Sequence, residues 1–248
     1  MSDTHATETL QPCVAVTGAN RNIGAHLAAR FLDDGFDVVA HYRSETAAIE
    51  RLAARGARLV RGSFDDAAAC TDIAERLAAA APSLRAIIHN ASSFAPTAAD
   101  IPAAATQFQD FFAVHMLAPY ILNTHLAAHL DGTPEAPADI IHITDIYADN
   151  PAPAQDLYCA TKAGLQNLSL AFAKRYAPRI KVNAIQPGPI SFEAWHDENH
   201  RSAVLEATPL GRMGSPEAIY AAVRAIMAND YQTGAVIPVD GGRRLGRG

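Results

Sequence analysis

Tyr158 and Lys162 stand four residues apart, and Asp145 precedes the tyrosine by thirteen residues. Residues four apart share one face of a helix, so the lysine ammonium can lie beside the phenol. A neighbouring cation favours the ionised phenol and makes it a usable proton donor near neutral pH. Taken singly, each side chain is more often a packing or surface residue. Together they predict a proton-transfer site with a carboxyl group beside it.

A glycine-containing turn lies between the first apolar run and the first helical pattern, in the segment Thr17 to Gly24. Gly18 and Gly24 permit a tight turn and a close approach of the backbone to a pyrophosphate. An ordinary β-to-α turn is the alternative. The position near the start of an alternating β/α chain favours a dinucleotide site.

The second predicted strand ends at Arg43 and Ser44 without an acidic residue. Enzymes that use NAD commonly have an acid there, which binds the ribose hydroxyls. Asp37 stands at the opposite end of the strand. Arg43, Ser44 and the loop residue Arg21 instead offer two cations and a hydroxyl that suit a 2′-phosphate. The predicted cofactor is NADPH, and a solvated surface role for Arg43 is the alternative.

Short β-branched runs alternate with alanine-rich stretches along the whole chain. This pattern predicts an α/β fold of one domain, with a doubly wound, seven-stranded parallel sheet of the Rossmann type and helices on both faces. The expected strands lie near residues 14–17, 37–41, 58–61, 86–89, 139–143, 181–185 and 235–238. The expected helices lie near residues 23–33, 45–54, 67–80, 107–130, 156–177 and 216–227. The ligand cleft should lie at the carboxyl ends of the strands.

Three segments interrupt this alternation. Residues 1–11 are polar and are expected to be disordered or extended, ahead of a domain that covers residues 12–248. Residues 131–138 contain glycine and two prolines and should form a surface loop. Residues 187–213 form a long connection, which we expect to close over the substrate as a lid.

The composition favours a small-molecule ligand. The chain has 248 residues, 49% of them hydrophobic and 19% charged, with a net charge of −6 and scattered basic residues. These values argue against nucleic acid or a membrane as a partner. Without a signal peptide pattern or a long apolar run, a cytoplasmic location is expected. The three separated cysteines and the ten dispersed histidines predict neither a disulfide framework nor a metal site.

The chain resembles the short-chain dehydrogenase/reductase family over nearly its whole length. The resemblance rests on the Gly18 to Gly24 loop, on the run His89-Asn90-Ala91-Ser92, on the Tyr158–Lys162 pair, on Pro187-Gly188, and on a terminal run from Thr233 to Gly242. It implies oxidoreductase activity, a nicotinamide cofactor and a homo-oligomer, expected to be a tetramer.

Three departures resemble one branch of that family. Asn22 replaces the middle glycine of the loop, Asp145 replaces the catalytic serine, and His115 replaces an asparagine of the long central helix. These features are similar to those of pteridine reductases and, more closely, of bacterial dihydromonapterin reductases. Phe94 falls where pteridine reductases place an aromatic ring against the pterin. Ser63 stands where the family commonly has an aspartate that faces the adenine.

The resemblance and the motifs together define the expected site. Asp145, Tyr158 and Lys162 are the expected catalytic residues, and His115 is a possible proton relay. The residues expected to contact the cofactor are Gly18, Arg21, Asn22, Ile23, Gly24, Arg43, Ser44, Ser63, Phe64, Asn90, Ala91, Ser92, Tyr158, Lys162, Pro187 and Gly188. The residues expected to contact the substrate are Ser92, Phe94, Asp145, Tyr158 and Trp195.

The carboxyl group of Asp145 favours a pterin over a ketone. A serine donates a hydrogen bond to the oxygen that gains charge during carbonyl reduction, whereas an ionised Asp145 cannot donate, would repel that charge and would raise the pKa of Tyr158. A pterin presents an amino group and ring nitrogens that can donate to Asp145. The alternative is a protonated Asp145 in a desolvated site, which would help to deliver the proton through Tyr158. The leading hypothesis is therefore an NADPH-dependent reductase of a dihydropterin, dihydromonapterin first. A general ketone or quinone reductase is the alternative, and a non-catalytic NADP(H)-sensing module is a third.

Overall fold

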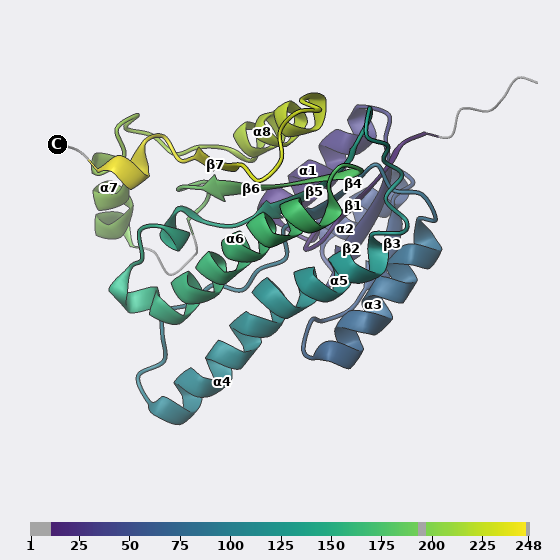
Figure 1. The fold of residues 1–248 in the computed structure, drawn as a ribbon. Helices are drawn as coiled ribbons and strands as arrows, with labels where there is room; N and C mark the ends of the chain where they lie inside the picture. The colour runs from purple at the N-terminus through teal and green to yellow at the C-terminus, as the bar shows by residue number, and fades with distance from the viewer. Residues whose placement is uncertain (1–10, 193–196, 247–248) are drawn as a thin grey trace, which may run out of the picture.

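The computed structural model describes residues 11–192 and 197–246. Its described part contains one sheet of seven parallel strands, in the order β3-β2-β1-β4-β5-β6-β7 (Figure 1). The strands are β1 (Cys13–Val16), β2 (Asp37–Tyr42), β3 (Arg58–Arg61), β4 (Ala86–His89), β5 (Ala138–Ile143), β6 (Ile180–Pro187) and β7 (Val236–Val239). The predicted fold class is confirmed. β6 alone extends two residues beyond its predicted carboxyl end.

Helices cover both faces of this sheet, as Figure 1 shows. The helices α1, α2 and α8 pack against one face, while α3, α5 and α6 pack against the other. The α-helices are α1 (Asn22–Asp33), α2 (Ala47–Ala54), α3 (Ala67–Ala80), α4 (Ile101–Phe112), α5 (Ala118–Leu126), α6 (Asp156–Tyr176), α7 (Glu198–Glu206) and α8 (Pro216–Ala228). The two layers cover both faces of the central strands, which explains why those strands are mostly apolar, with buried polar exceptions such as Asp139 and His142 of β5.

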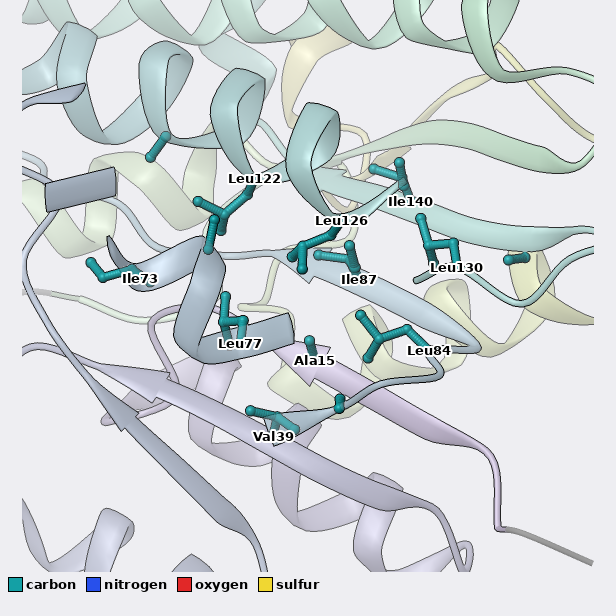
Figure 2. Packing of buried hydrophobic residues seen from close by; sticks show 14 of the residues in the cluster. Ala15, Val39, Ile73, Leu77, Leu84, Ile87, Leu122, Leu126, Leu130 and Ile140 are labelled. Carbon is teal, nitrogen blue, oxygen red and sulfur yellow. The ribbon is translucent and has the colours of Figure 1, made fainter. Parts of the chain in front are cut away.

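Figure 2 shows the core between the sheet and the layer of α3 and α5. Leu122 and Leu126 of α5 lie over Ile87 of β4, and Leu77 of α3 packs into the same cluster. All four side chains are buried. Complete burial of such a side chain contributes about 1.5–3 kcal/mol. This packing fixes α5, and hence the segment before it, relative to β4.

Side-chain caps set the start of several helices. The Asp66 carboxylate accepts a hydrogen bond from the Ala69 N–H at 2.8 Å, and Thr46 caps α2 in the same way. Each cap satisfies a backbone N–H that the helix leaves without a partner. The helix expected from residue 45 therefore begins at Ala47, after Thr46.

The single helix expected at residues 107–130 is wrong. The segment forms α4, the π-helical turn η1 (Ala113–Leu117) and α5. α4 begins six residues earlier than expected because Asp100 caps it and Pro102 occupies its first turn. Pro119 provides no N–H and would clash with the carbonyl four residues before it, that of His115. The wider turn of η1 accommodates the proline.

The long connection 187–213 contains a helix that the sequence analysis missed. α7 begins after Asp197, whose carboxylate accepts a hydrogen bond from the His200 N–H at 2.7 Å. Residues 1–10 and Trp195 lie outside the described residues. Within the described ranges, no helix is both long and apolar enough to cross a bilayer.

Candidate active site

Two cavities lie at the carboxyl edge of the sheet. The first measures about 280 Å³ and is lined by residues that follow β4, β5 and β6, among them Asn90, Asp145 and Gly188. The second measures about 260 Å³ and lies beside the turn after β1. Ser92 lines both cavities. The first is called the substrate cavity below, and the second the phosphate cavity.

The predicted catalytic residues meet in the substrate cavity. The Tyr158 hydroxyl donates to Asp145 Oδ2 at 2.8 Å, and the Tyr147 N–H donates to Asp145 Oδ1 at 2.9 Å. Lys162 Nζ donates to the Ile143 carbonyl at 3.0 Å and lies 5.6 Å from the centroid of the Tyr158 ring. All three predicted side chains line the cavity.

Local structure explains this meeting. Asp145 follows the end of β5 and caps the short helix η2 (Ile146–Ala148). α6 begins at Asp156, so Tyr158 lies in its first turn and Lys162 one turn later on the same face. Each oxygen of the Asp145 carboxyl group therefore accepts a hydrogen bond before any ligand enters.

Burial dominates the electrostatics of the three groups. Burial, and then the nearby Asp145 charge, raise the pKa of Tyr158 well above its usual value. Burial raises the pKa of Asp145, and it lowers the pKa of Lys162 to about 8, an effect that Asp145 opposes. Of the two influences expected on the phenol, the rise caused by the Asp145 charge agrees with this direction, and the net lowering expected from Lys162 does not, because burial dominates.

An aromatic wall stands beside the catalytic residues. The Phe94 ring lies 4.9 Å from the Tyr158 ring, centroid to centroid, at an interplanar angle of 81°. Phe111 meets Tyr158 edge-on from another side, at 6.1 Å. Phe94 lines the substrate cavity, as expected for a residue that would contact a flat ligand.

His115 lies behind this wall, within η1, and is completely buried. Its ring contacts Ser92 Oγ and Thr161 Oγ1, both at 2.8 Å. His115 lines neither the substrate cavity nor the phosphate cavity. The histidine ring also meets the Tyr158 ring edge-on, at 5.4 Å between centroids.

The turn after β1 has the geometry that a dinucleotide requires. Gly18 has φ +68°, and a Cβ atom at Gly24 would lie 2.2 Å from the Gly18 carbonyl oxygen, so neither position accepts a side chain. Asn22, which replaces the family's middle glycine, has φ +46°. Asparagine tolerates this left-handed conformation better than most residues, so the turn keeps its shape.

Basic and polar groups line the phosphate cavity. Arg21, Arg43, Ser63 and Phe64 all contribute to it, and the cations can pair with phosphate oxygens. Ser63 donates to Asp65 Oδ1 at 2.5 Å. An acidic group therefore stands in this cavity two residues after the position where the family commonly has one. The donor set fits a phosphorylated dinucleotide.

The structure also separates some predicted residues from the cavities. Asn22, Gly24 and Ser44 line neither of the two described cavities, and Ser44 is exposed. The first two shape the turn instead. The other predicted site residues within the described ranges, His115 apart, line one or both cavities: Gly18, Arg21, Ile23, Arg43, Ser63, Phe64, Asn90, Ala91, Ser92, Phe94, Asp145, Tyr158, Lys162, Pro187 and Gly188.

Sequence reasoning missed several residues of the substrate cavity, including Tyr147, Gln155, His200 and Arg243. Burial raises the pKa of Tyr147, and a contact with Arg243 opposes that rise. Tyr147 could have been found from its place two residues after Asp145. Arg243 follows the left-handed Gly242, and no local pattern connects it to residues about a hundred positions earlier.

Comparisons with known proteins place the chain in a family. Residues 18–244 match the family described as enoyl-(acyl carrier protein) reductase. The chain is 35% identical over 232 residues to a dihydromonapterin reductase of Klebsiella pneumoniae, covering 94% of this chain and 96% of the relative. It is 33% identical over 236 residues to a dihydromonapterin reductase of Citrobacter koseri, with the same coverage of both chains.

Solved structures show the same fold. A Serratia marcescens short-chain dehydrogenase/reductase mutant matches with a TM-score of 0.84 and 25% identity, over 95% of this chain and 99% of that one. The RhlG/NADP active-site complex of Pseudomonas aeruginosa matches with a TM-score of 0.84 and 25% identity, over 94% of this chain and 96% of that one. The chain belongs to the short-chain dehydrogenase/reductase family, and it is an oxidoreductase.

Proposed function

We propose that this short-chain dehydrogenase/reductase is an NADPH-dependent pterin reductase, which converts a dihydropterin, dihydromonapterin first, to its tetrahydro form. The observation that carries the proposal is Asp145, whose two oxygens accept from the Tyr147 N–H and the Tyr158 hydroxyl. A hydrogen-bond acceptor thus occupies the place where carbonyl reduction needs a donor. The relatives named dihydromonapterin reductase support this proposal.

Two features of the substrate cavity support a pterin as its ligand. Phe94 offers an aromatic wall, and the carboxyl group of Asp145 can accept from an amino group or a ring N–H. Binding an apolar ring face and a polar donor edge at once is typical of small-ligand sites. A simple ketone has no such donor edge. Its carbonyl oxygen would face the Asp145 carboxylate with no hydrogen bond to offset the repulsion.

The phosphate cavity supports NADPH as the cofactor. Arg21 and Arg43 would hold the phosphate groups, and Gly18 allows the backbone to approach them closely. When bound, NADPH supplies the hydride that adds to the carbon of the pterin C=N bond. The positions directly after β2 are Arg43 and Ser44 rather than an acid, so a cation and a hydroxyl stand where a 2′-phosphate would bind.

Tyr158 delivers the proton in this account. Hydride addition to a C=N bond leaves the electron pair on nitrogen, and the Tyr158 hydroxyl transfers its proton to that nitrogen. Such a nitrogen anion is far more basic than a phenolate, so the raised pKa of Tyr158 does not prevent the transfer. The Lys162 ammonium then offsets the negative charge left on the tyrosine, close to Asp145.

An NADPH-oxidation panel tests this function. The substrates are dihydromonapterin, dihydrobiopterin, dihydrofolate and several simple ketones, each with the wild-type protein. We expect rapid turnover of dihydropterins and slow turnover of ketones. Inert dihydropterins with rapid ketone or quinone turnover would favour a carbonyl reductase, and no turnover of any substrate would favour a cofactor-sensing module.

Two further expectations stay predictions. Residues 187–192 and α7 both contribute to the wall of the substrate cavity, which supports a lid function for segment 187–213. The helices α4, α5 and α6 carry the exposed side chains Phe108, Phe112, Tyr120 and Leu170, which support a homo-oligomer, expected to be a tetramer. Elution as a monomer in size-exclusion chromatography at micromolar concentration would contradict the second.

A further inference from the structure

His115 is held at both ring nitrogens although it is completely buried. Nδ1 lies 2.8 Å from Thr161 Oγ1, and Nε2 lies 2.8 Å from Ser92 Oγ. The ring is neutral, because burial lowers its pKa well below the usual value. A neutral imidazole donates from one nitrogen and accepts at the other. Its neighbours decide which nitrogen carries the proton.

Thr161 fixes the proton at Nδ1. Its hydroxyl donates to the Tyr158 backbone carbonyl at 2.9 Å. A hydroxyl has only one proton, so toward His115 the Thr161 oxygen can only accept. Nδ1 of His115 is therefore the donor in that contact.

Ser93 leads to the same assignment from the other side of the ring. Its backbone N–H donates to His115 Nε2 at 3.3 Å. A backbone N–H cannot accept, so Nε2 carries a lone pair. The Ser92 hydroxyl lies 2.8 Å from that same nitrogen and 3.4 Å from the Ser93 carbonyl oxygen, so its single proton goes to the nearer acceptor, Nε2. The two ends of the imidazole independently require one tautomer.

We propose that His115 is a positioning residue. It accepts a hydrogen bond from the Ser92 hydroxyl, so the Ser92 oxygen can act toward the substrate only as a hydrogen-bond acceptor. The inference rests on the proposed pterin reductase function. Ser92 lines both cavities, so the part of its oxygen that does not face Tyr158 can accept from a ligand there. This role differs from the relay predicted from the sequence, because His115 holds its own proton toward Thr161.

The opposite tautomer would reverse the polarity of Ser92. A proton on Nε2 would free the Ser92 hydroxyl to donate to Tyr158, which it also contacts. That arrangement would set the Nε2 proton of His115 against the N–H of Ser93. It would also leave two acceptors, Nδ1 and the Thr161 oxygen, facing each other while Thr161 donates to Tyr158. Both contacts would be repulsive.

The consequence concerns substrate choice. Ser92 and Asp145 together present acceptors on the substrate cavity, so the site selects an edge of amino and N–H donors. A ligand with a carbonyl oxygen on that edge would face lone pairs. A site built to bind a donor rejects an analogue that lacks it, so we expect a preference of roughly tenfold or more.

Nuclear magnetic resonance can read the tautomer directly. The full-length protein is labelled with ¹⁵N-histidine, and long-range ¹H–¹⁵N correlations are recorded without ligand. The His115→Gln variant identifies the His115 signals by their loss. We expect a protonated Nδ1 and an unprotonated Nε2, unchanged between about pH 6 and pH 8 because the ring does not titrate there. A protonated Nε2, or a doubly protonated ring, would overturn the assignment.

A double-mutant cycle tests whether His115 acts through Ser92. Pterin and lumazine are the probes, because lumazine has a carbonyl oxygen in place of the 2-amino group. Their dissociation constants are measured for wild type, Ser92→Ala, His115→Asn and the double variant. Each single change should reduce the pterin preference at least about threefold, and the double variant should lose no more than Ser92→Ala alone. Additive losses would show that His115 acts on the fold instead.

His142 provides a matched control for replacing a buried histidine. Its two nitrogens contact Asn123 Nδ2 at 3.1 Å and Ser169 Oγ at 2.8 Å, and it lines neither described cavity. His142→Asn should lower the unfolding temperature without changing the pterin preference. A changed preference would mean that any buried histidine affects the site, which would contradict a specific role for His115.

The two experiments separate this inference from the proposed function. Reduction of dihydropterins with a protonated Nε2 would overturn the inference and leave the proposed function standing. A wild-type protein that neither binds pterin nor reduces dihydropterins would overturn the proposed function and the substrate preference together. In that case the ligand-free spectrum still decides the tautomer.

Discussion

The two cavities that meet at Ser92 are lined by different kinds of side chain. The phosphate cavity is lined by the glycine turn after β1, by Arg21 and Arg43, and by Asp65 and Asp110, whereas the substrate cavity is lined by aromatic and aliphatic side chains around the Asp145 carboxyl group and the Lys162 ammonium. The first offers two guanidinium groups for phosphate oxygens, and the second offers a buried carboxyl group for donors of a ligand. The contrast suggests that affinity for the cofactor depends on charge, while choice of substrate depends on hydrogen-bond polarity.

Loss of the proton donor should have the largest effect on the substrate side. We expect Tyr158→Phe to lower kcat for dihydropterin reduction by about 10²–10⁴, the range for general acid catalysis, because the variant lacks the hydroxyl that delivers the proton. The KM for the dihydropterin should change less, since the phenyl ring keeps its contacts. Steady-state kinetics of NADPH oxidation measures both parameters.

Tyr220 is the matched control, because it is also a buried tyrosine whose hydroxyl donates to a carboxylate, that of Asp34 at 2.7 Å. Tyr220→Phe should lower stability and leave kcat close to that of the wild type. Equal kcat in the wild type and Tyr158→Phe would remove Tyr158 from the mechanism.

A smaller effect is expected on the cofactor side. Arg43→Ala should raise the KM for NADPH about tenfold, because it removes a charge-assisted contact of about 1.5 kcal/mol. The KM for NADH should hardly change, since NADH lacks the 2′-phosphate. Arg55→Ala is the control, as Arg55 pairs with Asp33 at 2.6 Å outside both cavities. Parallel increases for NADPH and NADH would contradict a specific phosphate contact.

The smallest predicted effect is a shift in a pH profile. Burial lowers the pKa of Lys162 to about 8, so its positive charge is lost as the pH rises through that value. We expect kcat/KM for dihydropterin reduction to fall as the pH rises through about 8, which gives the pH profile an alkaline limb. Asp145→Asn removes the negative charge that opposes the lowering, so the limb should move to lower pH.

Asp149→Asn tests whether the pH shift is specific. The Asp149 carboxylate accepts from Gln166 and Gln186 and lines neither described cavity. Its loss should leave the limb in place. A limb that moves to higher pH in Asp145→Asn, or that is absent below about pH 9, would contradict the assignment to Lys162.

Prediction from sequence succeeded where neighbours along the chain determine the structure. The Gly18 to Gly24 turn, the strand ends and the Tyr158–Lys162 spacing are local, so their geometry followed from the residue types. The carboxyl edge of a parallel sheet then brought Asp145 to the same place. The turn after β1 and the meeting of Asp145 with the Tyr158–Lys162 pair could therefore be predicted from the sequence.

The rest depended on contacts between distant parts of the chain. Arg243 reaches the substrate cavity only because β7 lies beside β6 at the edge of the sheet. The π-helical turn at His115 has the same helix-forming composition as its flanks, and only the steric demand of Pro119 reveals it. The largest cause of the raised Tyr158 pKa is burial, which sequence spacing does not give, whereas the smaller contribution of Asp145 followed from the residue type.

The most direct test of the account is the substrate preference of Asp145→Ser compared with that of the wild type. The measurement is kcat/KM for dihydromonapterin divided by kcat/KM for a simple ketone, with NADPH as the reductant. The serine hydroxyl restores a donor where the carboxylate accepts, so we expect the ratio to fall by about 10²–10³, the usual effect of one such donor. An unchanged ratio would contradict the claim that Asp145 determines the substrate.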